Sequence, residues 1–176
     1  VPGHHMVRNA ALAVAAGVAM GMTLSAAAEG LRGIQLSKGR MESRLLGGIQ
    51  FFDDTYNANP DSMKAALSTM AQWPATGRRI AILGRMGELG SHAEAGHRAV
   101  GSAAAAGIDA LYTVGSEADW ISDEARRNGF AEVTHFPDTA TAADSLRSVL
   151  REGDVVLVKG SRSARMERFI EEVTRP

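Results

Sequence analysis

Short apolar runs alternate with longer mixed segments along the chain from residue 41 onward. The runs are rich in β-branched and aromatic residues, a composition typical of strands. They span residues 79–83, 110–114, 132–136 and 155–158. The mixed segments repeat apolar residues at helical spacing and predict helices at about 60–73, 92–106, 117–128, 139–150 and 164–173. Because strands and helices alternate, we expect a mostly parallel sheet with helices on both faces.

A glycine pair predicts one antiparallel strand in this sheet. Residues 41–46 and 49–54 flank Gly47 and Gly48. Two adjacent glycines supply positive φ at both central positions of a tight turn, so the two runs predict a hairpin. The sheet is then expected to have six strands.

Several residues predict where the helices begin, end and pack. Asn59 followed by Pro60 predicts a helix start, and Ser91 with Glu94 predicts a capping box. The expected left-handed helix ends are Gly107 and Gly129. The expected buried stripes are Met63, Ala66, Leu67 and Met70 on one helix, and Met166, Phe169, Ile170 and Val173 on the last.

The first part of the chain differs from the rest. Residues 5–20 and 25–31 predict two helices of small side chains separated by Gly21, and the polar, glycine-containing stretch at 33–43 predicts a connection between two bodies. We therefore expect the end of one domain at 1–34, a linker at 35–44 and a second domain at 45–176.

Composition excludes several classes of function. The net charge is −1, so bulk charge gives no pull toward nucleic acid or a membrane surface. The alanine-rich stretch at 10–28 is broken by glycines and is too weakly apolar to predict a membrane span. No cysteine is present, which excludes disulfides and thiolate chemistry and is compatible with the cytoplasm, the expected location.

Polar chemistry is concentrated after the strand at 49–52, in "DDTYNANP". The carboxyl ends of parallel strands form the ligand-binding edge of such sheets. A carboxylate there, such as that of Asp54, can accept ribose hydroxyls or join a Mg²⁺ shell, and a helix start offers free N–H groups to phosphate. The alternative, of equal weight on chemistry alone, is that Asp54 and Asn59 only cap the turn.

Two further loops are expected at the same edge. The glycines of "LGRMGELGSH" match no nucleotide-binding fingerprint, so a plain flexible loop is favoured there. In "VKGSRSARME", Lys159, Arg162 and Arg165 surround serines, a combination suited to a carboxylate or a phosphate, although a solvated helix start is the alternative. No histidine has metal-ligand spacing, so core or surface roles are expected for all of them.

Three of these segments resemble the C-terminal part of the Mur ligase family. They are "DDTYNANPDSM", "LGRMGELG" and "LVKGSRSARMERFI", and the intervening "HRAVGSAAAAGIDALYTVG" is similar as well. The tyrosine-asparagine form of the first segment and the "KGSRS" form of the last resemble the branch that adds D-alanyl-D-alanine to UDP-N-acetylmuramoyl-tripeptide. The resemblance implies a Rossmann-like domain preceded by helices of the central ATPase domain.

The start of the chain carries a weaker part of this resemblance. "GHHMVRNAALAV" is similar to a family helix whose asparagines contact adenine; Asn9 matches one of them and Met6 replaces the other. Arg40, in "KGR", matches an arginine that approaches the nucleotide phosphates. Arg85 departs from the family, which usually has an acid at that position.

The resemblance also implies a reaction and roles for residues. ATP phosphorylates the tripeptide carboxylate, and the amine of the dipeptide attacks the acyl phosphate to form an amide. The phosphate-binding loop and the Mg²⁺ ligands of the family belong to the central domain, so this segment alone is expected to be inactive. Asp54 is implied as the ribose contact. The implied reaction-edge residues are Tyr56, Asn57 and Asn59, and those implied near the dipeptide carboxylate are Lys159, Ser161 and Arg162.

Two other classes stay open at this point. A related amide ligase, either another Mur ligase or a folylpolyglutamate-type synthetase, would keep the fold and change the amine-side residues. A stand-alone nucleotide-binding module would need no further domain.

Overall fold

The computed structural model describes residues 4–33 and 38–175 of the chain, which form two compact units, 1–37 and 38–176. The expected linker lies partly outside these residues, because 34–37 are not described. None of the helices within the described residues is both long and apolar enough to cross a membrane.

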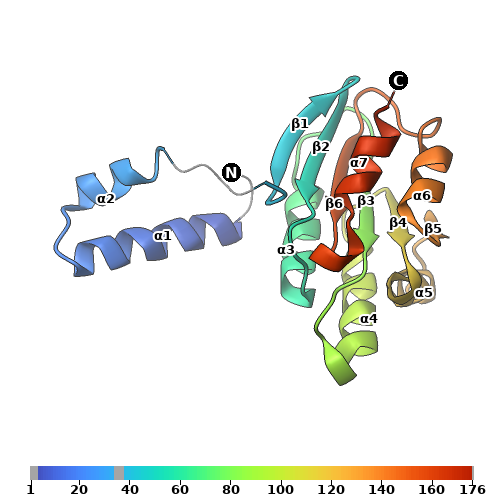
Figure 1. Cartoon of the computed structure of the whole chain (residues 1–176), viewed down its shortest axis with the longest axis horizontal. Coiled ribbons are helices and arrows are strands. Elements are labelled where there is room, and N and C mark those ends of the chain that lie inside the picture. The colour runs from blue at the N-terminus through green and yellow to red at the C-terminus, as the bar shows by residue number, and fades with distance from the viewer. Residues whose placement is uncertain (1–3, 34–37, 176) are drawn as a thin grey trace. The chain divides into compact units, whose positions relative to one another are not determined.

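The first unit consists of α1 (His4–Ala19) and α2 (Leu24–Gly30), as predicted (Figure 1). The two helices pack closely at Gly17, where an added Cβ would lie 3.4 Å from the Cβ of Ala27 on α2. Within this unit Ala27 alone is buried among the residues whose side chains are described. Several of its large apolar side chains are exposed, namely Val7, Leu12, Val18, Met20, Met22 and Leu24. The described part of this unit therefore has no core of its own.

The second unit is built on a six-stranded sheet with the order β1-β2-β6-β3-β4-β5 (Figure 1). The strands are β1 (Glu42–Leu46), β2 (Ile49–Asp54), β3 (Arg79–Gly84), β4 (Ala110–Val114), β5 (Val133–Phe136) and β6 (Val155–Lys159). β1 pairs antiparallel with β2, and every other pairing is parallel. The predicted mixed sheet with one antiparallel hairpin strand is confirmed.

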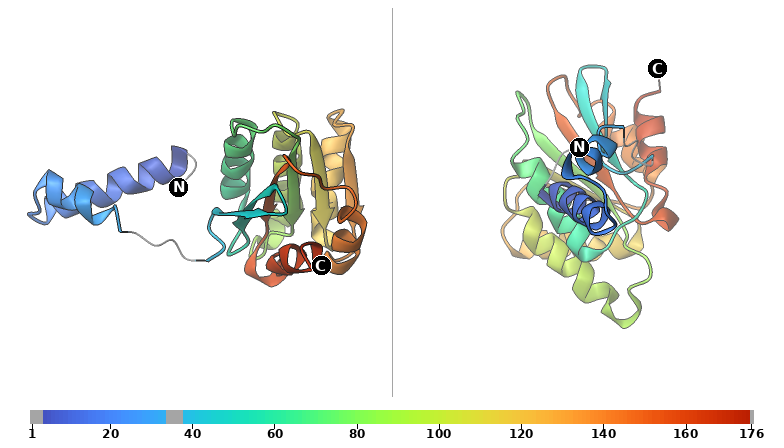
Figure 2. Two further views of the ribbon diagram at one scale, coloured as in Figure 1. Left: turned by 90° about the horizontal axis from the view of Figure 1, so that it is seen from above. Right: turned by 90° about the vertical axis from the view of Figure 1, so that its left-hand side faces the viewer.

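Five helices cover the sheet in two layers (Figure 2). They are α3 (Pro60–Ala71), α4 (Ala93–Ala104), α5 (Asp119–Arg127), α6 (Thr139–Leu146) and α7 (Glu167–Val173), with 3-10 turns η1 (Gly90–His92), η2 (Ser116–Ala118) and η3 (Arg162–Ala164). One core holds α3, α4 and α5 against one face, and the other holds α6 and α7 against the opposite face. Phe51 and Phe52 show the two-residue period of the strand, since each enters a different core.

The local signals explain most helix ends, with two corrections. Asn59 caps α3 as predicted: its side chain accepts a hydrogen bond from Ser62 N, and the buried stripe of this helix is the expected one. The capping box predicted from Ser91 and Glu94 is wrong, because the N-cap of α4 is His92 and makes no side-chain cap bond. The carboxylate of Glu94 instead accepts a hydrogen bond from Arg98, one turn later.

The last helix is also shorter than predicted. Arg165 has φ 50° and ψ 43°, a left-handed conformation that separates η3 from α7. The predicted stripe of Met166, Phe169, Ile170 and Val173 is nevertheless buried. The interruption turns the chain so that Met166 can enter the core directly beyond the end of β6.

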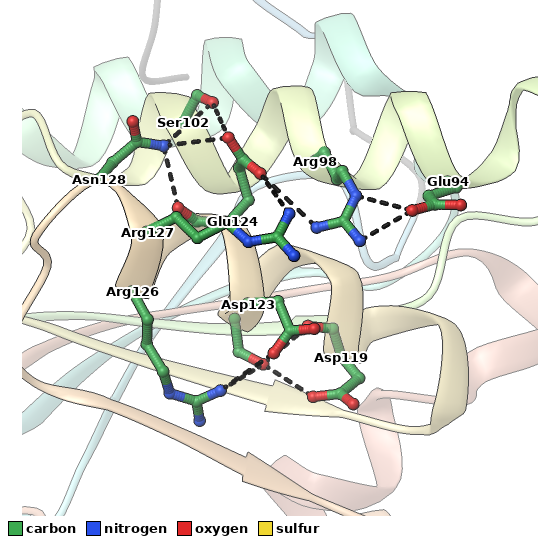
Figure 3. A network of polar contacts seen from close by, with 10 residues as sticks. Glu94, Arg98, Ser102, Asp119, Asp123, Glu124, Arg126, Arg127 and Asn128 are labelled. Atoms are coloured by element: carbon green, nitrogen blue, oxygen red, sulfur yellow. Dashed lines mark hydrogen bonds and ion pairs between the residues drawn. The ribbon is translucent and has the colours of Figure 1, made fainter.

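Close packing of α4 on α5 depends on a glycine beside a polar network. A Cβ on Gly101 would lie 2.4 Å from the carbonyl oxygen of Ile121, so the two backbones meet there. On the surface nearby, Arg98 joins Glu94 on its own helix to Glu124 on α5, and Asn128 donates to Ser102 (Figure 3). This pairing fixes the helix that follows β3, and with it the loop between them.

Candidate functional site

The order of the strands creates a crevice at the end of β6. The chains leaving β2 and β3 lead to α3 and α4 on one face, whereas the chain leaving β6, the strand between them, leads to α7 on the other. Such a topological switch point is where open α/β sheets bind ligands. A cavity of about 480 Å³ lies here. It is lined by Asn57 from the β2 loop, Gly87 and Glu88 from the β3 loop, and Ser161, Arg162, Ser163 and Arg165 from the β6 loop.

An ion pair joins the ends of β2 and β6 beside this cavity. Lys159 Nζ lies 2.6 Å from Asp54 Oδ2 and also donates to the carbonyl oxygen of Asn57, at 2.9 Å. The Lys159 side chain is 2% exposed and that of Asp54 15%. The ammonium group is therefore satisfied within the protein and holds the start of the "DDTYNANP" loop against β6.

The segment Gly39–Met41 is fastened to the same loop. Tyr56 N donates to the carbonyl oxygen of Gly39 at 2.9 Å, and Met41 N donates to Asp54 Oδ1 at 3.1 Å. Gly39 has a positive φ of 73°, and a Cβ there would lie 3.0 Å from Tyr56 N. Between these anchors the guanidinium of Arg40 lies over the ring of Tyr56, 4.3 Å from its centroid.

Asp53, the neighbour of Asp54, has a structural role. Its Oδ1 accepts hydrogen bonds from the backbone N and the hydroxyl of Thr55, and its Oδ2 lies 3.3 Å from Arg44 Nη2. Both Asp53 and Thr55 are buried. The two adjacent carboxylates therefore differ: Asp53 shapes the turn, and Asp54 faces Lys159.

The loop after β3 is tied down at several points, although the sequence favoured a plain flexible loop. Met86 is buried, and its N–H donates to His97 Nε2 at 2.9 Å. His97 Nδ1 lies 2.7 Å from the carbonyl oxygen of Ala93 and must donate to it, so the ring is neutral with Nε2 as the acceptor. Burial lowers the pKa of His97 and favours this neutral form.

Contacts with neighbouring loops hold the same segment from the other side. Ser161 N donates to the carbonyl oxygen of Arg85 at 2.9 Å. Arg85 Nε lies 2.9 Å from Glu117 Oε2. Where the family usually has an acid, this chain thus has a base, and an acid from the loop after β4 accompanies it.

Two glycines let the β3 and β6 loops approach each other. A Cβ on Gly84 would lie 2.7 Å from Met166 Cγ, and one on Gly160 would lie 2.6 Å from the same atom. Met166 is fully buried between them. The side chain of Met166 therefore occupies the space that side chains at positions 84 and 160 would need, and it joins the core on the face covered by α6 and α7.

Charge of both signs borders the cavity. Arg162 Nη1 lies 3.0 Å from Glu167 Oε1, and the Arg162 side chain is 70% exposed, so most of its donors are open to solvent. Glu88 and Arg165 also line the cavity, and both have positive φ. Among the described residues the only other non-glycine residue with positive φ is Met41, the partner of Asp54. Backbone strain in this domain is thus confined to the loops at the carboxyl edge of the sheet.

The residues present fit a nucleotide in part. A carboxylate has about four acceptor positions, so Asp54 can still accept hydroxyl groups beyond its two hydrogen bonds. Arg40 is exposed and offers a planar set of donors suited to phosphate. No group of three or more histidine or acidic side chains suitable for a metal ion occurs among residues 4–33 and 38–175.

The chain matches the family model described as "Mur ligase, glutamate ligase domain" over residues 39–162. This chain belongs to the Mur ligase family. The match covers the junction segment Gly39–Met41, the sheet, the loops after β2 and β3, and the β6 loop as far as Arg162. The Rossmann-like fold expected from the motifs is thereby shown.

Relatives of this Mur ligase segment are much longer proteins. The UDP-N-acetylmuramoyl-tripeptide--D-alanyl-D-alanine ligase of Escherichia coli is 40% identical over 97% of this chain, which corresponds to 37% of the relative. The crystal structure of MurF from Acinetobacter baumannii superposes with a TM-score of 0.86, at 31% identity, over 98% of this chain and 38% of that one. A MurF ligase from Thermotoga maritima, in complex with ADP, gives 0.76 at 27% identity over 92% and 36%. This chain thus spans just over a third of its relatives.

The structure brings together most of the residues singled out in the sequence. Asp54 and Lys159 form an ion pair, and Asn57, Ser161 and Arg162 line the cavity. Asn9 is an exposed residue of the first unit. The carboxamide oxygen of Asn59 is occupied by its cap bond to Ser62 N.

Sequence reasoning missed three lining residues, Gly87, Glu88 and Ser163. Gly87 and Glu88 lay in the loop interpreted as plain, and Ser163 lay in the segment expected to bind a carboxylate or phosphate but was not singled out. One signal for Glu88 was its place between two glycines of a loop that follows a strand of the parallel sheet, at the edge where such sheets bind ligands.

Proposed function

We propose that this chain is the C-terminal portion of an ATP-dependent ligase that joins D-alanyl-D-alanine to UDP-N-acetylmuramoyl-tripeptide. The observation that carries the proposal is the 40% identity to the E. coli enzyme of that name across 97% of the chain. The cavity at the topological switch point supports it, since that cavity offers the polar and charged lining that a small peptide requires. Peptidoglycan precursor synthesis, in the cytoplasm where ATP is available, is the proposed setting.

We further propose that residues 1–34 are the last helices of a central ATP-binding domain and 45–176 the C-terminal domain, joined by a linker at 35–44. The first unit supports this division because it buries almost nothing by itself and exposes several large apolar side chains. Such a surface requires a covering partner. The missing N-terminal and central domains of the same chain would supply it, together with the phosphate-binding loop and the ligands of Mg²⁺.

For the nucleotide, the proposed contacts are Asp54 for the ribose, Arg40 for the phosphates and Asn9 for the adenine. The first two are supported by spare hydrogen-bonding capacity at a strand end and at the adjoining segment. The proposal for Asn9 depends on its place in the family motif alone. ATP would convert the unreactive tripeptide carboxylate into a carboxyl group with a good leaving group.

For the dipeptide, Ser161 and Arg162 are the proposed carboxylate contacts, because both line the cavity and Arg can bind a carboxylate with two parallel hydrogen bonds. Tyr56, Asn57 and Asn59 stay as proposed reaction-edge residues. Lys159 is proposed to act indirectly. Its ammonium group bonds to Asp54 and Asn57, so it affects the dipeptide site by positioning the loop after β2.

The domain would work by orientation. Its closure onto the central domain brings the amine of the dipeptide to the activated carboxyl group, and correct placement of two reactants supplies several kcal/mol of rate acceleration.

A reconstituted assay with the full-length protein tests the proposal. The protein is incubated with ATP, Mg²⁺, UDP-N-acetylmuramoyl-tripeptide and D-alanyl-D-alanine, and the product is identified by mass spectrometry alongside phosphate release. Other amino acids replace the dipeptide in parallel reactions. Ligation of a different amine in preference to D-alanyl-D-alanine would contradict the proposed substrate and favour another branch of the family.

Two substitutions separate the proposed sites. Asp54→Ala should raise the KM for ATP, whereas Arg162→Ala should raise the KM for the dipeptide about tenfold or more, the effect of losing a charge-assisted hydrogen bond. Arg127→Ala serves as the matched control, since Arg127 is an exposed arginine on α5. An unchanged dipeptide KM in Arg162→Ala would remove Arg162 from the site.

A further inference from the structure

We propose that Glu88 binds the ammonium group of the dipeptide and so helps to select a zwitterionic acceptor. This inference rests on the proposed function and deepens it, because the family resemblance assigned only the carboxylate side of the acceptor. Three observations on the loop after β3 carry it, together with the chemistry of the acceptor.

Glu88 lies directly beside the proposed carboxylate contacts. The preceding residue, Gly87, approaches the β6 loop so closely that a Cβ on it would be 3.5 Å from the hydroxyl oxygens of Ser161 and Ser163. Glu88 itself lines the same cavity as these serines and Arg162. The β3 loop therefore contributes an acidic side chain to the cavity lining, and the β6 loop contributes the basic side chains of Arg162 and Arg165.

The backbone of Glu88 is held in a conformation that a glutamate adopts at a cost. Its φ is 64°, a left-handed value that glycine adopts freely and that costs other residues about 1 kcal/mol or more. A glutamate at such a position is explained when its carboxylate binds a ligand, which glycine cannot do. Within the described residues no ion pair involves this carboxylate, and the residue is exposed at the cavity rim.

The loop that carries Glu88 is well positioned. Met86 N bonds to His97, and the carbonyl oxygen of Arg85 accepts from Ser161 N. These bonds fix the backbone two and three residues before Glu88. A carboxylate on a fixed loop can orient a cation with little loss of conformational entropy.

The chemistry of the acceptor fits this arrangement. A free dipeptide has an ammonium group at one end and a carboxylate at the other, so it needs one acid and one base from its site. The two arginines and the serines of the β6 loop satisfy the carboxylate, and Glu88 supplies the acid. The cavity thereby distinguishes a dipeptide with a free amine from one that is acylated.

The experiment uses the full-length enzyme and two ligands. D-Alanyl-D-alanine is the substrate, and N-propionyl-D-alanine, in which hydrogen replaces the amino group, is a competitive inhibitor. In Glu88→Gln the KM for the dipeptide should rise about tenfold or more, as expected for a lost charge-assisted bond. The inhibition constant of N-propionyl-D-alanine should not change, because that ligand has no ammonium group to lose.

Two further variants make the test decisive. Glu88→Gly removes the carboxylate and relieves the backbone, and it should raise the KM for the dipeptide as Glu88→Gln does. Glu132→Gln, an exposed glutamate at the amino end of β5, is the matched control and should leave both constants unchanged. The KM for ATP should be unaffected in all three.

The results that overturn the inference differ from those that overturn the proposed function. An active wild-type enzyme whose Glu88 variants keep the wild-type KM, or lose dipeptide and analogue binding equally, overturns the role of Glu88 alone. A wild-type enzyme that does not ligate the dipeptide overturns both.

Discussion

Lys159 and Asp54 lie 105 positions apart in the sequence, and their charged groups meet at 2.6 Å where β6 runs beside β2. Through this pair β6, the last strand of the chain, holds the loop that follows β2 in place. Each partner also bonds to the backbone: Lys159 to the carbonyl oxygen of Asn57 and Asp54 to the N–H of Met41. One ion pair thus fastens β6, the polar loop and the junction segment together.

Removing one member of this pair should be costly. In Lys159→Met the carboxylate of Asp54, only 15% exposed, would lose its counter-charge, and the free energy of unfolding should fall by about 3 kcal/mol. Urea unfolding of the chain measures this. Because the same loop carries the proposed ribose contact, the KM for ATP of the full-length enzyme should rise as well.

The double variant Asp54→Asn/Lys159→Met checks the cause. It removes both charges, so it should be more stable than Lys159→Met alone, even though it carries one more substitution. A double variant less stable than Lys159→Met would mean that the charges themselves are not what the pair contributes.

Either the ring or the hydroxyl group of Tyr56 could be the part that contributes to activity, and two substitutions distinguish them. The guanidinium of Arg40 lies 4.3 Å from the ring centroid, so the ring face holds Arg40 in place. Tyr56→Phe keeps this face and should leave the KM for ATP near the wild-type value. Tyr56→Leu removes it and should raise the KM for ATP about threefold, which corresponds to a cation–π contact of about 0.6 kcal/mol at an exposed site.

Steady-state kinetics with both variants separates the positioning of Arg40 by the ring from a direct role of the hydroxyl group in the reaction. If the hydroxyl takes part in the reaction, Tyr56→Phe will lower kcat as much as Tyr56→Leu does. That result would favour the reaction-edge role over the positioning of Arg40.

The sequence predicted the elements of the sheet well but not their order. Each strand is encoded locally: the Gly47-Gly48 turn specifies the hairpin, and Asn59-Pro60 specifies the start of α3. The insertion of β6 between β2 and β3 is not encoded in that way, because its run of apolar residues suits any central position. For the same reason Lys159 was grouped with Arg162 and Arg165 as a ligand-binding cation, because its partner Asp54 can be named only when the neighbouring strand is known.

The two incorrect helix predictions have a shared physical origin. In each, a good local signal was overridden by a contact with a distant or competing group. Glu94 pairs with Arg98 and not with the cap, and the turn at Arg165 places Met166 between Gly84 and Gly160. Both glycines were visible in the sequence, but what they accommodate was not.

The contact between α4 and α5 should tolerate no added methyl group. In Gly101→Ala the new Cβ would meet the Ile121 carbonyl oxygen at 2.4 Å, and a backbone atom cannot rotate away as a side chain can. The helices must separate, and the free energy of unfolding should fall by about 2 kcal/mol, within the range found for overpacked cores.

Ser102→Ala is the matched control on the same helix. It removes only an exposed hydroxyl group with long hydrogen bonds to Glu124 and Asn128, and should change the stability by less than about 0.5 kcal/mol. Thermal or urea unfolding of both variants measures the difference. Equal stability of Gly101→Ala and the wild type would show that the two helices can shift without cost.

His97 should make the stability of this domain depend on pH. Burial lowers its pKa in the folded state, and the neutral ring accepts the Met86 N–H bond that positions the β3 loop. Between the folded pKa and the ordinary histidine value of about 6.5, the unfolded chain binds more protons than the folded one. The contribution of His97 is therefore complete above about pH 6.5 and decreases as the pH falls below that value, by at most about 1.4 kcal/mol per pH unit.

Urea unfolding at a series of pH values, compared with His97→Gln, isolates this contribution. The variant has no titrating ring at position 97, so the difference in stability between it and the wild type should shrink as the pH falls below about 6.5. His92→Gln, at an exposed position, is the control and should preserve the wild-type slope. In NMR titrations His97 should protonate below the ordinary histidine pKa of about 6.5. Protonation of His97 at that ordinary value or above it would contradict the buried neutral ring and its bond to the loop that carries Glu88.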